Sequence, residues 1–404
     1  MPAMTCTASP PSDQRLTIVP SVPVWVVDNQ VVFDRKFHDG LACYIGGWTG
    51  PVRLLARRGT TALPAFGAVH INAADLPCEL VLLDGSERAG PAHLADTTVV
   101  MAAADDHTQL HLGALCRALG IRCVYVIEMI PETRHQMNRL DAPNALVRWR
   151  RDLFLRRAER ARRAAFRACD GLQANGLPAH DAYQRHGNCL LYFDTRVSRH
   201  TLIDDRTLAA RLAQLYLPKP RPLRLAFSGR LIAMKGADHL VAVAARLRAR
   251  GVHCEWTVYG SGDLEAAMHA DVARLGLAGH FKLAGAVDFD TALIPAIQSS
   301  CDLYVMLHRQ SDPSCTYLET LACGIPIVGY ANRALAGLLR QAKVGEQVPM
   351  DDIDQIVEVL ARLDVDRPAI ARMARAARAF AEAHAFEDTF QRRVAHLQQV
   401  ASAA

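Results

Sequence analysis

Short apolar segments alternate with helix-like segments along most of this 404-residue chain, and no other sequence feature limits its possible folds as strongly. Apolar runs this short suit strands that are buried inside a parallel sheet. Strand–helix alternation therefore predicts doubly wound α/β sheets. The proline-rich run 217–222 (LPKPRP) interrupts the alternation and predicts a boundary between two domains.

The ends of the predicted elements follow from glycine, proline and capping residues. In the first half we expect strands at 22–27, 80–83, 98–102, 123–127 and 170–175, and helices at 39–44, 107–119, 145–168 and 207–217. In the second half we expect strands at 223–228, 254–259, 281–283, 303–307 and 325–329, and helices at 237–250, 264–275, 291–299, 313–323, 353–363 and 370–400. The predicted organisation is a disordered leader at 1–14, an amino-terminal domain at 15–217, a linker at 218–222, a carboxyl-terminal domain at 223–380 and a last helix at 381–404.

Composition excludes several classes of protein. Half of the residues are hydrophobic, which argues against a disordered or fibrous chain, yet no run reaches the roughly 18 apolar residues of a membrane span. Eleven cysteines without a C-x-x-C pair fit neither a disulfide framework nor a zinc site, and they predict a cytoplasmic protein. A net charge of +5 (46 − 41) is too small to predict nucleic-acid binding.

The first candidate for chemistry follows the strand that ends at Ser228. Gly229 allows a close turn, and Arg230 and Lys235 precede the next helix. Two cations beside the amino end of a helix form an anion site, because the unbonded N–H groups there carry partial positive charge. The alternative is an ordinary strand-to-helix turn with surface cations.

A second glycine-rich loop follows the strand at 254–259. Gly260 and Gly262 resemble the start of a dinucleotide-binding loop, but Glu265 stands where that pattern has its third glycine. The sequence therefore argues against a nicotinamide site. A glycine-rich loop at the end of a strand is common in any doubly wound fold, so this motif alone is weak.

The most specific motif is the segment 311–326. Asp312 is a suitable N-cap and Pro313 suits the first helical position, while Gly324 and Pro326 end the helix. The free N–H groups of Ser314, Cys315 and Thr316 would then bind phosphate. Glu319 lies about two turns after Asp312 and could reach the hydroxyls of a ribose. A capped helix without a ligand is the alternative.

In their order along the chain, these motifs resemble those of retaining GT-B glycosyltransferases of the family 4 type (glycosyl transferases group 1). The resemblance covers about 223–363 well and the amino-terminal half only in outline. It implies two Rossmann-like domains that face each other across a cleft, with the last helix crossing back to the first domain. The motifs that carry it are Gly229-Arg230, Lys235-Gly236, Gly260-Ser261-Gly262, Gly285-x-Val287 and the run 319–328 (ETLACGIPIV).

The resemblance implies a nucleotide-diphosphate sugar as donor, with UDP or GDP as the nucleotide and no other cofactor. Arg230 and Lys235 would hold the diphosphate and replace a metal ion, so that no metal site is expected. Glu319 would hold the ribose, and Val287 would lie at the base. The remaining donor contacts implied are Gly229, Gly260, Gly262, Ser311, Ser314, Cys315 and Thr316.

One position departs from the family pattern. The family pairs two glutamates eight positions apart, but Ser311 stands eight positions before Glu319. The missing carboxylate normally lies beside the donor sugar. Asp312 is adjacent and could replace it, unless it is committed as a helix cap.

In the amino-terminal half, Asp39, Gly40 and Gly47 stand where the family has a glycine-rich loop against the donor. Glu128 follows a predicted strand and is a candidate catalytic carboxylate. His107 follows another predicted strand and is either a general base or a polar residue at a helix start, and the second interpretation is favoured.

The segment 145–168 is a basic amphipathic helix with nine arginines and two acidic residues. Such a helix is typical of an anionic membrane surface, although a solvated helix packed on the sheet fits equally well. We therefore expect a cytoplasmic protein that associates with the membrane or remains in solution. Its expected function is sugar transfer with retention to a glycan, lipid-linked or small-molecule acceptor. The alternatives are a nucleotide-binding protein without turnover and a sugar-nucleotide 2-epimerase.

Overall fold

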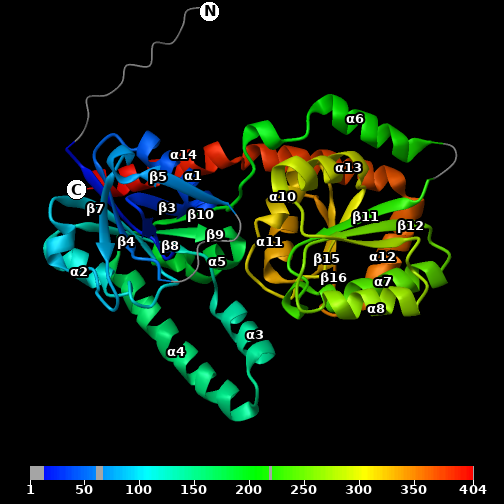
Figure 1. The fold of residues 1–404 in the computed structure, drawn as a ribbon, viewed down its shortest axis with the longest axis horizontal. Helices are drawn as coiled ribbons and strands as arrows, with labels where there is room; N and C mark the ends of the chain where they lie inside the picture. Colours follow the sequence, from blue (N-terminus) through cyan, green and yellow to red (C-terminus); the bar gives the residue numbers. More distant parts are fainter. Residues whose placement is uncertain (1–12, 61–66, 218–220, 404) are drawn as a thin grey trace, which may run out of the picture.

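The computed structural model describes residues 13–60, 67–217 and 221–403, which form two α/β domains side by side (Figure 1). The predicted leader lies outside the described residues except for Asp13 and Gln14, and residues 218–220 of the predicted linker also lie outside them. Of the helices in the described part of the chain, none is long and apolar enough to cross a bilayer.

The amino-terminal domain contains a seven-stranded parallel sheet in the order β10-β9-β8-β7-β1-β4-β6. Its strands are β1 (Arg15–Val19), β4 (Val52–Arg57), β6 (Glu79–Leu83), β7 (Thr97–Ala103), β8 (Arg122–Ile127), β9 (Gly171–Asn175) and β10 (Cys189–Tyr192). Ile18 of β1 pairs with Leu54 of β4 and with Met101 of β7, so that β1 lies inside the sheet. Both faces of such a strand are buried, which explains its nearly continuous apolar sequence.

The first strand of this sheet differs from the prediction. We expected residues 22–27 to open the parallel sheet, but Trp25–Val27 is β2 of a separate antiparallel sheet with β3 (Gln30–Asp34) and β5 (Ala68–Asn72). The central strand is β1 instead. Residues 15–19 begin with Arg15, whose polar side chain obscures an otherwise buried run.

Six α-helices of the first half connect these strands: α1 (Arg35–Gly47), α2 (Leu112–Leu119), α3 (Pro131–Asp141), α4 (Ala145–Ala168), α5 (Gly176–Tyr183) and α6 (Asp205–Ala213). The bounds predicted for α4 are confirmed. Helix α1 begins earlier than predicted because Asp34 caps it, accepting a hydrogen bond from the N–H of Phe37 at 3.1 Å. Helix α2 begins later, since residues 104–111 form turns.

The carboxyl-terminal domain has a six-stranded parallel sheet in the order β13-β12-β11-β14-β15-β16. The order in which the strands are added to the sheet reverses between β11 and β14, and ligands of open α/β sheets bind at the carboxyl ends of the strands at such a point. The strands are β11 (Leu223–Ser228), β12 (Cys254–Tyr259), β13 (Phe281–Gly285), β14 (Leu303–Met306), β15 (Ile327–Tyr330) and β16 (Gly345–Val348). The helices are α7 (Ala237–Ala249), α8 (Glu265–Arg274), α9 (Ile294–Ser300), α10 (Thr316–Ala322), α11 (Arg333–Gln341) and α12 (Ile353–Val365).

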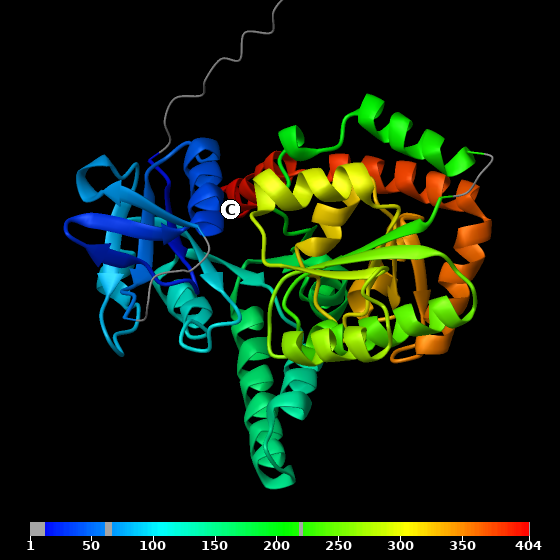
Figure 2. The same cartoon turned by 45° about the vertical axis from the view of Figure 1, so that its right-hand side comes forward.

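The last part of the chain is two helices rather than the single helix predicted at 370–400. Helix α13 (Arg367–Ala383) packs on the carboxyl-terminal domain, and α14 (Phe386–Ser402) crosses to the other domain (Figures 1 and 2). Phe390, Val394 and Leu397 of α14 belong to the same buried cluster as Leu16 and Ile18. The expected crossing of the last helix is therefore present.

Candidate functional site

The loop after β11 positions the two predicted cations differently. Arg230 is exposed, whereas Lys235 at the end of the short helix η6 (Ala233–Lys235) is 9% exposed. The Lys235 ammonium interacts electrostatically with Arg230 and with Cys315 and Glu319 at the start of α10. Burial, reinforced by the charge of Arg230, lowers the pKa of Lys235 to about 8, although Cys315 and Glu319 oppose this shift.

A buried histidine lies close enough to this lysine to feel its charge. His308 follows β14, and neither of its ring nitrogens has a hydrogen-bond partner among the described residues. Burial and the charge of Lys235 hold the pKa of His308 well below its usual value, so its ring is neutral. Lys235 therefore lies near the uncharged ring of His308. Within the described ranges, no carboxylate forms an ion pair with Lys235.

The two glycines predicted in the loop after β12 allow its backbone to lie close to the loop after β11. Gly260 has a φ of 124°, and a Cβ there would lie 2.0 Å from the carbonyl oxygen of Gly229. A Cβ on Gly262 would lie 2.7 Å from the carbonyl oxygen of Leu231. These glycines thus let the loops after β11 and β12 pack together, and Val287 is exposed in the loop after the neighbouring strand β13.

The start of α10 differs from the prediction. Asp312 is not the N-cap, because the helix begins at Thr316 with Cys315 as its cap. Asp312 Oδ1 instead accepts a hydrogen bond from the N–H of Ile130 in the other domain at 2.9 Å. Burial raises the pKa of Asp312 to about 7, although this N–H opposes the shift. Asp312 therefore does not share a helix face with Glu319.

Ser311 is also buried against the amino-terminal domain. Its Oγ donates to Oε1 of Glu132 at 3.0 Å, and its N–H donates to the side-chain oxygen of Gln136 at 3.2 Å. Glu132 forms an ion pair with Arg333 as well. The position where the family pattern has a carboxylate is thus covered by a carboxylate from α3.

A third cation, which the sequence analysis missed, reaches the start of α10 from the other domain. Lys36 of α1 forms an ion pair with Asp194, and its Nζ lies 3.0 Å from Cys315 Sγ. Burial alone would lower the pKa of Lys36, but the charges and hydrogen bonds of Asp194 and Cys315 together outweigh it and the pKa is raised. Nothing in the spacing of Lys36 and Asp194, 158 residues apart, could have indicated this contact.

Glu319 is buried on α10 and carries a partner that the sequence analysis also missed. Its Oε1 accepts a hydrogen bond from Nε of Arg196 at 3.0 Å and forms an ion pair with Nη2 of the same residue at 2.9 Å. The Arg196 guanidinium in turn lies 4.0 Å from the centre of the Phe289 ring. Burial raises the pKa of Glu319, and Arg196 opposes this shift. A ligand hydroxyl at Glu319 would therefore share the carboxylate with Arg196.

Glu128 is exposed at the carboxyl end of the amino-terminal sheet, directly after β8. Its two oxygens accept from Nδ2 of Asn175 and from the hydroxyl of Tyr192, each at 2.9 Å. Desolvation by the surrounding protein and the nearby charge of Asp194 raise the pKa of Glu128, while Lys36 opposes the shift. This carboxylate is thus held in place and lies close to the Lys36–Asp194 pair.

The predicted acceptor-side loop is wrong, because Asp39, Gly40 and Gly47 lie within helix α1. A Cβ on Gly40 would lie 2.8 Å from the ring of Phe390, and one on Gly47 would lie 3.2 Å from the side chain of Val394. The two glycines therefore make room for α14. Asp39 is exposed beside His38, and His107 is exposed in the turns that precede α2.

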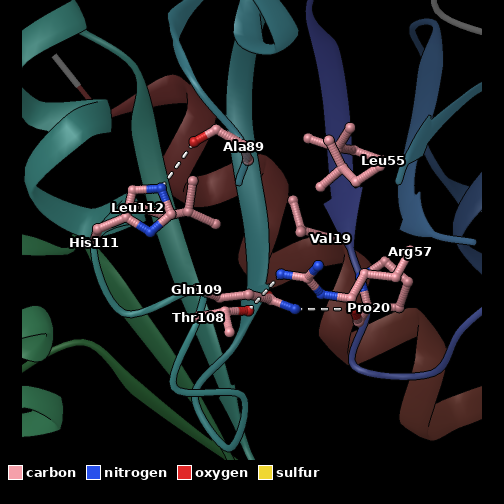
Figure 3. Close-up of a pocket in the computed structure, with 10 residues that line it drawn as sticks. Val19, Pro20, Leu55, Arg57, Ala89, Thr108, Gln109, His111 and Leu112 are labelled. Atoms are coloured by element: carbon pink, nitrogen blue, oxygen red, sulfur yellow. Dashed lines mark hydrogen bonds between the residues drawn. The ribbon is translucent and has the colours of Figure 1, made fainter. Parts of the chain in front are cut away.

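A small cavity lies near the carboxyl ends of β1 and β4 (Figure 3). Gln109 Nε2 donates to the carbonyl oxygen of Pro20 at 2.9 Å, and Arg57 Nη2 donates to the Thr108 hydroxyl at 3.0 Å. The volume of about 10 Å³ holds about one water molecule, so this cavity cannot admit a sugar. Within the described ranges, no three His, Cys, Asp or Glu side chains are grouped to hold a metal ion.

The structure thus brings Lys36 and the buried, unpaired Lys235 near the start of α10, with Arg230 close to Lys235. Lys235 and Arg230 come from one domain and Lys36 from the other, and Glu319 and Glu128 are the nearby carboxylates. Helix α10 has only seven residues, so the side-chain cations contribute most of the positive charge there. Chemically, this arrangement suits a polyanion flanked by hydroxyl groups.

Comparison with solved structures identifies the architecture. The crystal structure of Anabaena HepE in complex with UDP aligns over 96% of this chain and 99% of that chain, with a TM-score of 0.63 and 14% identity. Together with the two parallel sheets, this shows the GT-B fold, and the fold expected from the sequence is confirmed.

Residues 214–380 match the family model described as "Glycosyl transferases group 1". The chain is 25% identical over 171 residues to alpha-D-kanosaminyltransferase of Streptomyces kanamyceticus, which covers 42% of this chain and 44% of that protein. It is 26% identical over 184 residues to GDP-mannose-dependent alpha-(1-6)-phosphatidylinositol monomannoside mannosyltransferase of Mycolicibacterium smegmatis, with coverage of 44% and 47%. The matches thus span less than half the length of these relatives.

Proposed function

We propose that this protein is a glycosyltransferase that moves a sugar from a nucleotide-diphosphate sugar to an acceptor hydroxyl. The observation that carries this proposal is Lys235, a buried ammonium that faces Arg230 and the start of α10 without a paired carboxylate. A buried unpaired charge is unfavourable, and an anionic ligand would remove this penalty. A diphosphate supplies two negative groups, which Arg230 and Lys36 can share.

The roles of the residues follow from their places. Lys235 and Arg230 bind the diphosphate and stabilise the charge that develops on the departing nucleotide, which is why we propose transfer without a metal ion. Glu319, which shares its carboxylate with Arg196, accepts hydrogen bonds from the ribose hydroxyls. Glu128 is the candidate polar group beside the sugar. Retention of configuration remains part of the proposal, with a leaving phosphate oxygen taking the acceptor proton on the same side of the sugar.

The related proteins narrow the donors worth testing. One is crystallised with UDP and another is named for GDP-mannose, so both nucleotides belong in the test. The same mannosyltransferase is named for a phosphatidylinositol-linked acceptor. We propose a glycan, lipid-linked or small-molecule acceptor for this chain, in the cytoplasm.

The test is calorimetric titration with UDP, GDP and ADP, followed by nucleotide release from the corresponding sugar donors. Lys235→Ala should weaken binding of the preferred nucleotide and reduce turnover by about 10²- to 10³-fold. Lys343→Ala is the matched control. Lys343 is exposed and precedes β16, so it lies at the amino ends of the strands of this sheet, whereas Lys235 lies beyond their carboxyl ends. Failure of all three nucleotides to bind at millimolar concentration would refute the proposal.

The same measurements separate the alternatives. Nucleotide binding without release from any donor, with or without acceptors, would identify a nucleotide-binding protein without turnover. Conversion of a nucleotide sugar in the absence of an acceptor would identify a 2-epimerase. The burial of Ser311 against Glu132 gives the first alternative its physical basis, since the donor sugar would have to displace this contact.

A further inference from the structure

Helices α3 and α4 form a hairpin that projects away from both sheets in two views (Figures 1 and 2). The two helices are joined on one side of α4. Nδ2 of Asn138 donates to the carbonyl oxygen of Arg148 and to Oδ1 of Asp152, each at 2.9 Å. His135 Nδ1 lies 2.7 Å from the same carboxylate oxygen. The side of α4 that carries Arg148 and Asp152 is therefore covered by α3.

The opposite side of α4 is free and unusually apolar. Leu146, Trp149 and Leu153 are spaced at i, i+3 and i+7, so they form one stripe, and Leu146 and Trp149 are 66% and 63% exposed. Phe154 beside the stripe is 60% exposed, and Leu140 on α3 is also exposed. Single exposed apolar residues are ordinary, but a group of large side chains at a projecting tip marks an interaction surface.

Arginines lie within and beyond this stripe on α4. Arg150, Arg157 and Arg160 lie at helical spacing from the apolar residues and are exposed. The two acidic residues of α4 are already engaged, Asp152 with His135 and Glu159 with Arg162 and Arg163. The free side of α4 thus combines apolar side chains with positive charge that no acidic residue of the helix neutralises.

We propose that the α3–α4 hairpin docks on an anionic membrane surface. Trp149, Leu146 and Phe154 would enter the headgroup region, where aromatic rings and apolar side chains are favourable. Arg150, Arg157 and Arg160 would pair with lipid phosphates, which guanidinium groups bind through two hydrogen bonds. A second copy of the chain fits this surface less well, because it would bring the same arginines together. A nucleic acid also fits less well, because it would leave the apolar tip exposed to water. The proposal does not rest on sugar transfer, since this surface is separate from Lys235.

Vesicle flotation and tryptophan fluorescence test the proposal on the 404-residue chain. The other three tryptophans, Trp25, Trp48 and Trp256, are buried, so a blue shift on adding vesicles reports on Trp149. We expect binding to vesicles containing phosphatidylglycerol at least about tenfold tighter than to pure phosphatidylcholine vesicles, and weaker binding in high salt.

The variants are chosen on exposed positions so that folding is preserved. Arg150→Glu with Arg157→Glu should reduce binding to phosphatidylglycerol vesicles at least about tenfold. Trp149→Ser with Phe154→Ser should also reduce it. The matched control is Arg206→Glu with Arg372→Glu, which makes the same change in net charge on α6 and α13 and should have no more than a small effect.

Three outcomes would overturn the proposal. The first is no binding of the wild type to phosphatidylglycerol vesicles. The second is an equal loss in the control pair, which would assign binding to net charge rather than to the hairpin. The third is a dimer in solution that the Trp149→Ser and Phe154→Ser changes dissociate. Nucleotide titration of the same variants should match the wild type, so a failure here is distinct from a failure of the proposed function.

Discussion

At the scale of single residues, Lys235 is the most informative side chain. Its residue type and place after β11 suggested an anion site. The sequence could not show that Lys235 is buried and lies near the neutral ring of His308. Burial makes the charge of this lysine conditional, because its pKa of about 8 lies within an accessible range. A ligand that requires the ammonium must therefore compete with its deprotonation.

We predict that UDP affinity falls as the pH rises through about 8. Below this pH the free protein already holds the proton on Lys235, whereas above it each unit of pH costs up to about tenfold in affinity. The terminal phosphate of UDP, with a second pKa near 6, is about fully ionised above pH 8, so it does not cause the fall in affinity there. Calorimetry between pH 7 and 9.5 measures the dependence.

Lys235→Met is the control for this dependence. It should bind UDP more weakly and show no change between pH 7 and 9.5, since the titrating group has been removed. A parallel fall in affinity for the wild type and for this variant would assign the pH dependence to another group. The pH dependence of stability has the opposite direction. Between pH 8 and the pKa of an unfolded lysine near 10.4, the unfolded chain binds more protons at Lys235 than the folded protein does, so the contribution of Lys235 to the free energy of unfolding rises with pH.

At the scale of elements, helix α7 illustrates how one loop is held in place. A glycine with positive φ precedes the helix and another follows it: Gly236 at 70° and Gly251 at 75°. A Cβ at Gly236 would lie 2.0 Å from the carbonyl oxygen of Leu307, while nothing lies within 4 Å of a Cβ at Gly251. Only the first glycine therefore allows two backbone segments to approach, and it stands directly after Lys235.

We predict that Gly236→Ala and Gly251→Ala have different consequences. Gly251→Ala should lower the free energy of unfolding by about 1 kcal/mol, the cost of a left-handed residue with a side chain. Gly236→Ala should cost about 2 to 5 kcal/mol, because the clash with Leu307 is added, and it should weaken UDP binding. Urea denaturation and calorimetry measure the two effects. Equal destabilisation by both changes would contradict the role given to the close approach.

At the scale of the whole molecule, the last helix, α14, stabilises the domain that contains the first strand, β1. Helix α14 completes the buried cluster that contains β1, whereas α13, immediately before it, packs on the other domain. The glycines of α1 make this possible, since side chains at Gly40 and Gly47 would meet α14. The break at His384 and Ala385 is thus the point at which the chain passes from one domain to the other.

We predict that Leu397→Ala destabilises the amino-terminal domain by about 2 to 5 kcal/mol, the usual cost of truncating a fully buried leucine. Hydrogen exchange should then increase in β1, β4 and β7 rather than in the carboxyl-terminal sheet. Leu360→Ala is the matched control, because Leu360 is equally buried in α12 but belongs to the core of the carboxyl-terminal domain. Increased exchange in β11 and β14 for Leu397→Ala would refute the prediction.

The sequence by itself determined the elements whose signals are local. Strand–helix alternation, glycine and proline at element ends, and the arginine-rich pattern of 145–168 predicted the α/β class and the bounds of β11, β12 and α4. These signals are local because periodicity and capping depend on neighbours along the chain.

Only the tertiary structure decided which groups meet. Asp312 has the residue type of an N-cap, but its carboxylate instead accepts a hydrogen bond from the N–H of Ile130 in the other domain. Lys36 reaches Cys315 from another domain, and Gly40 serves the packing of α14 rather than a loop. Each of these contacts joins residues more than 180 positions apart, and such pairings are set by how the two domains pack, which no local pattern encodes.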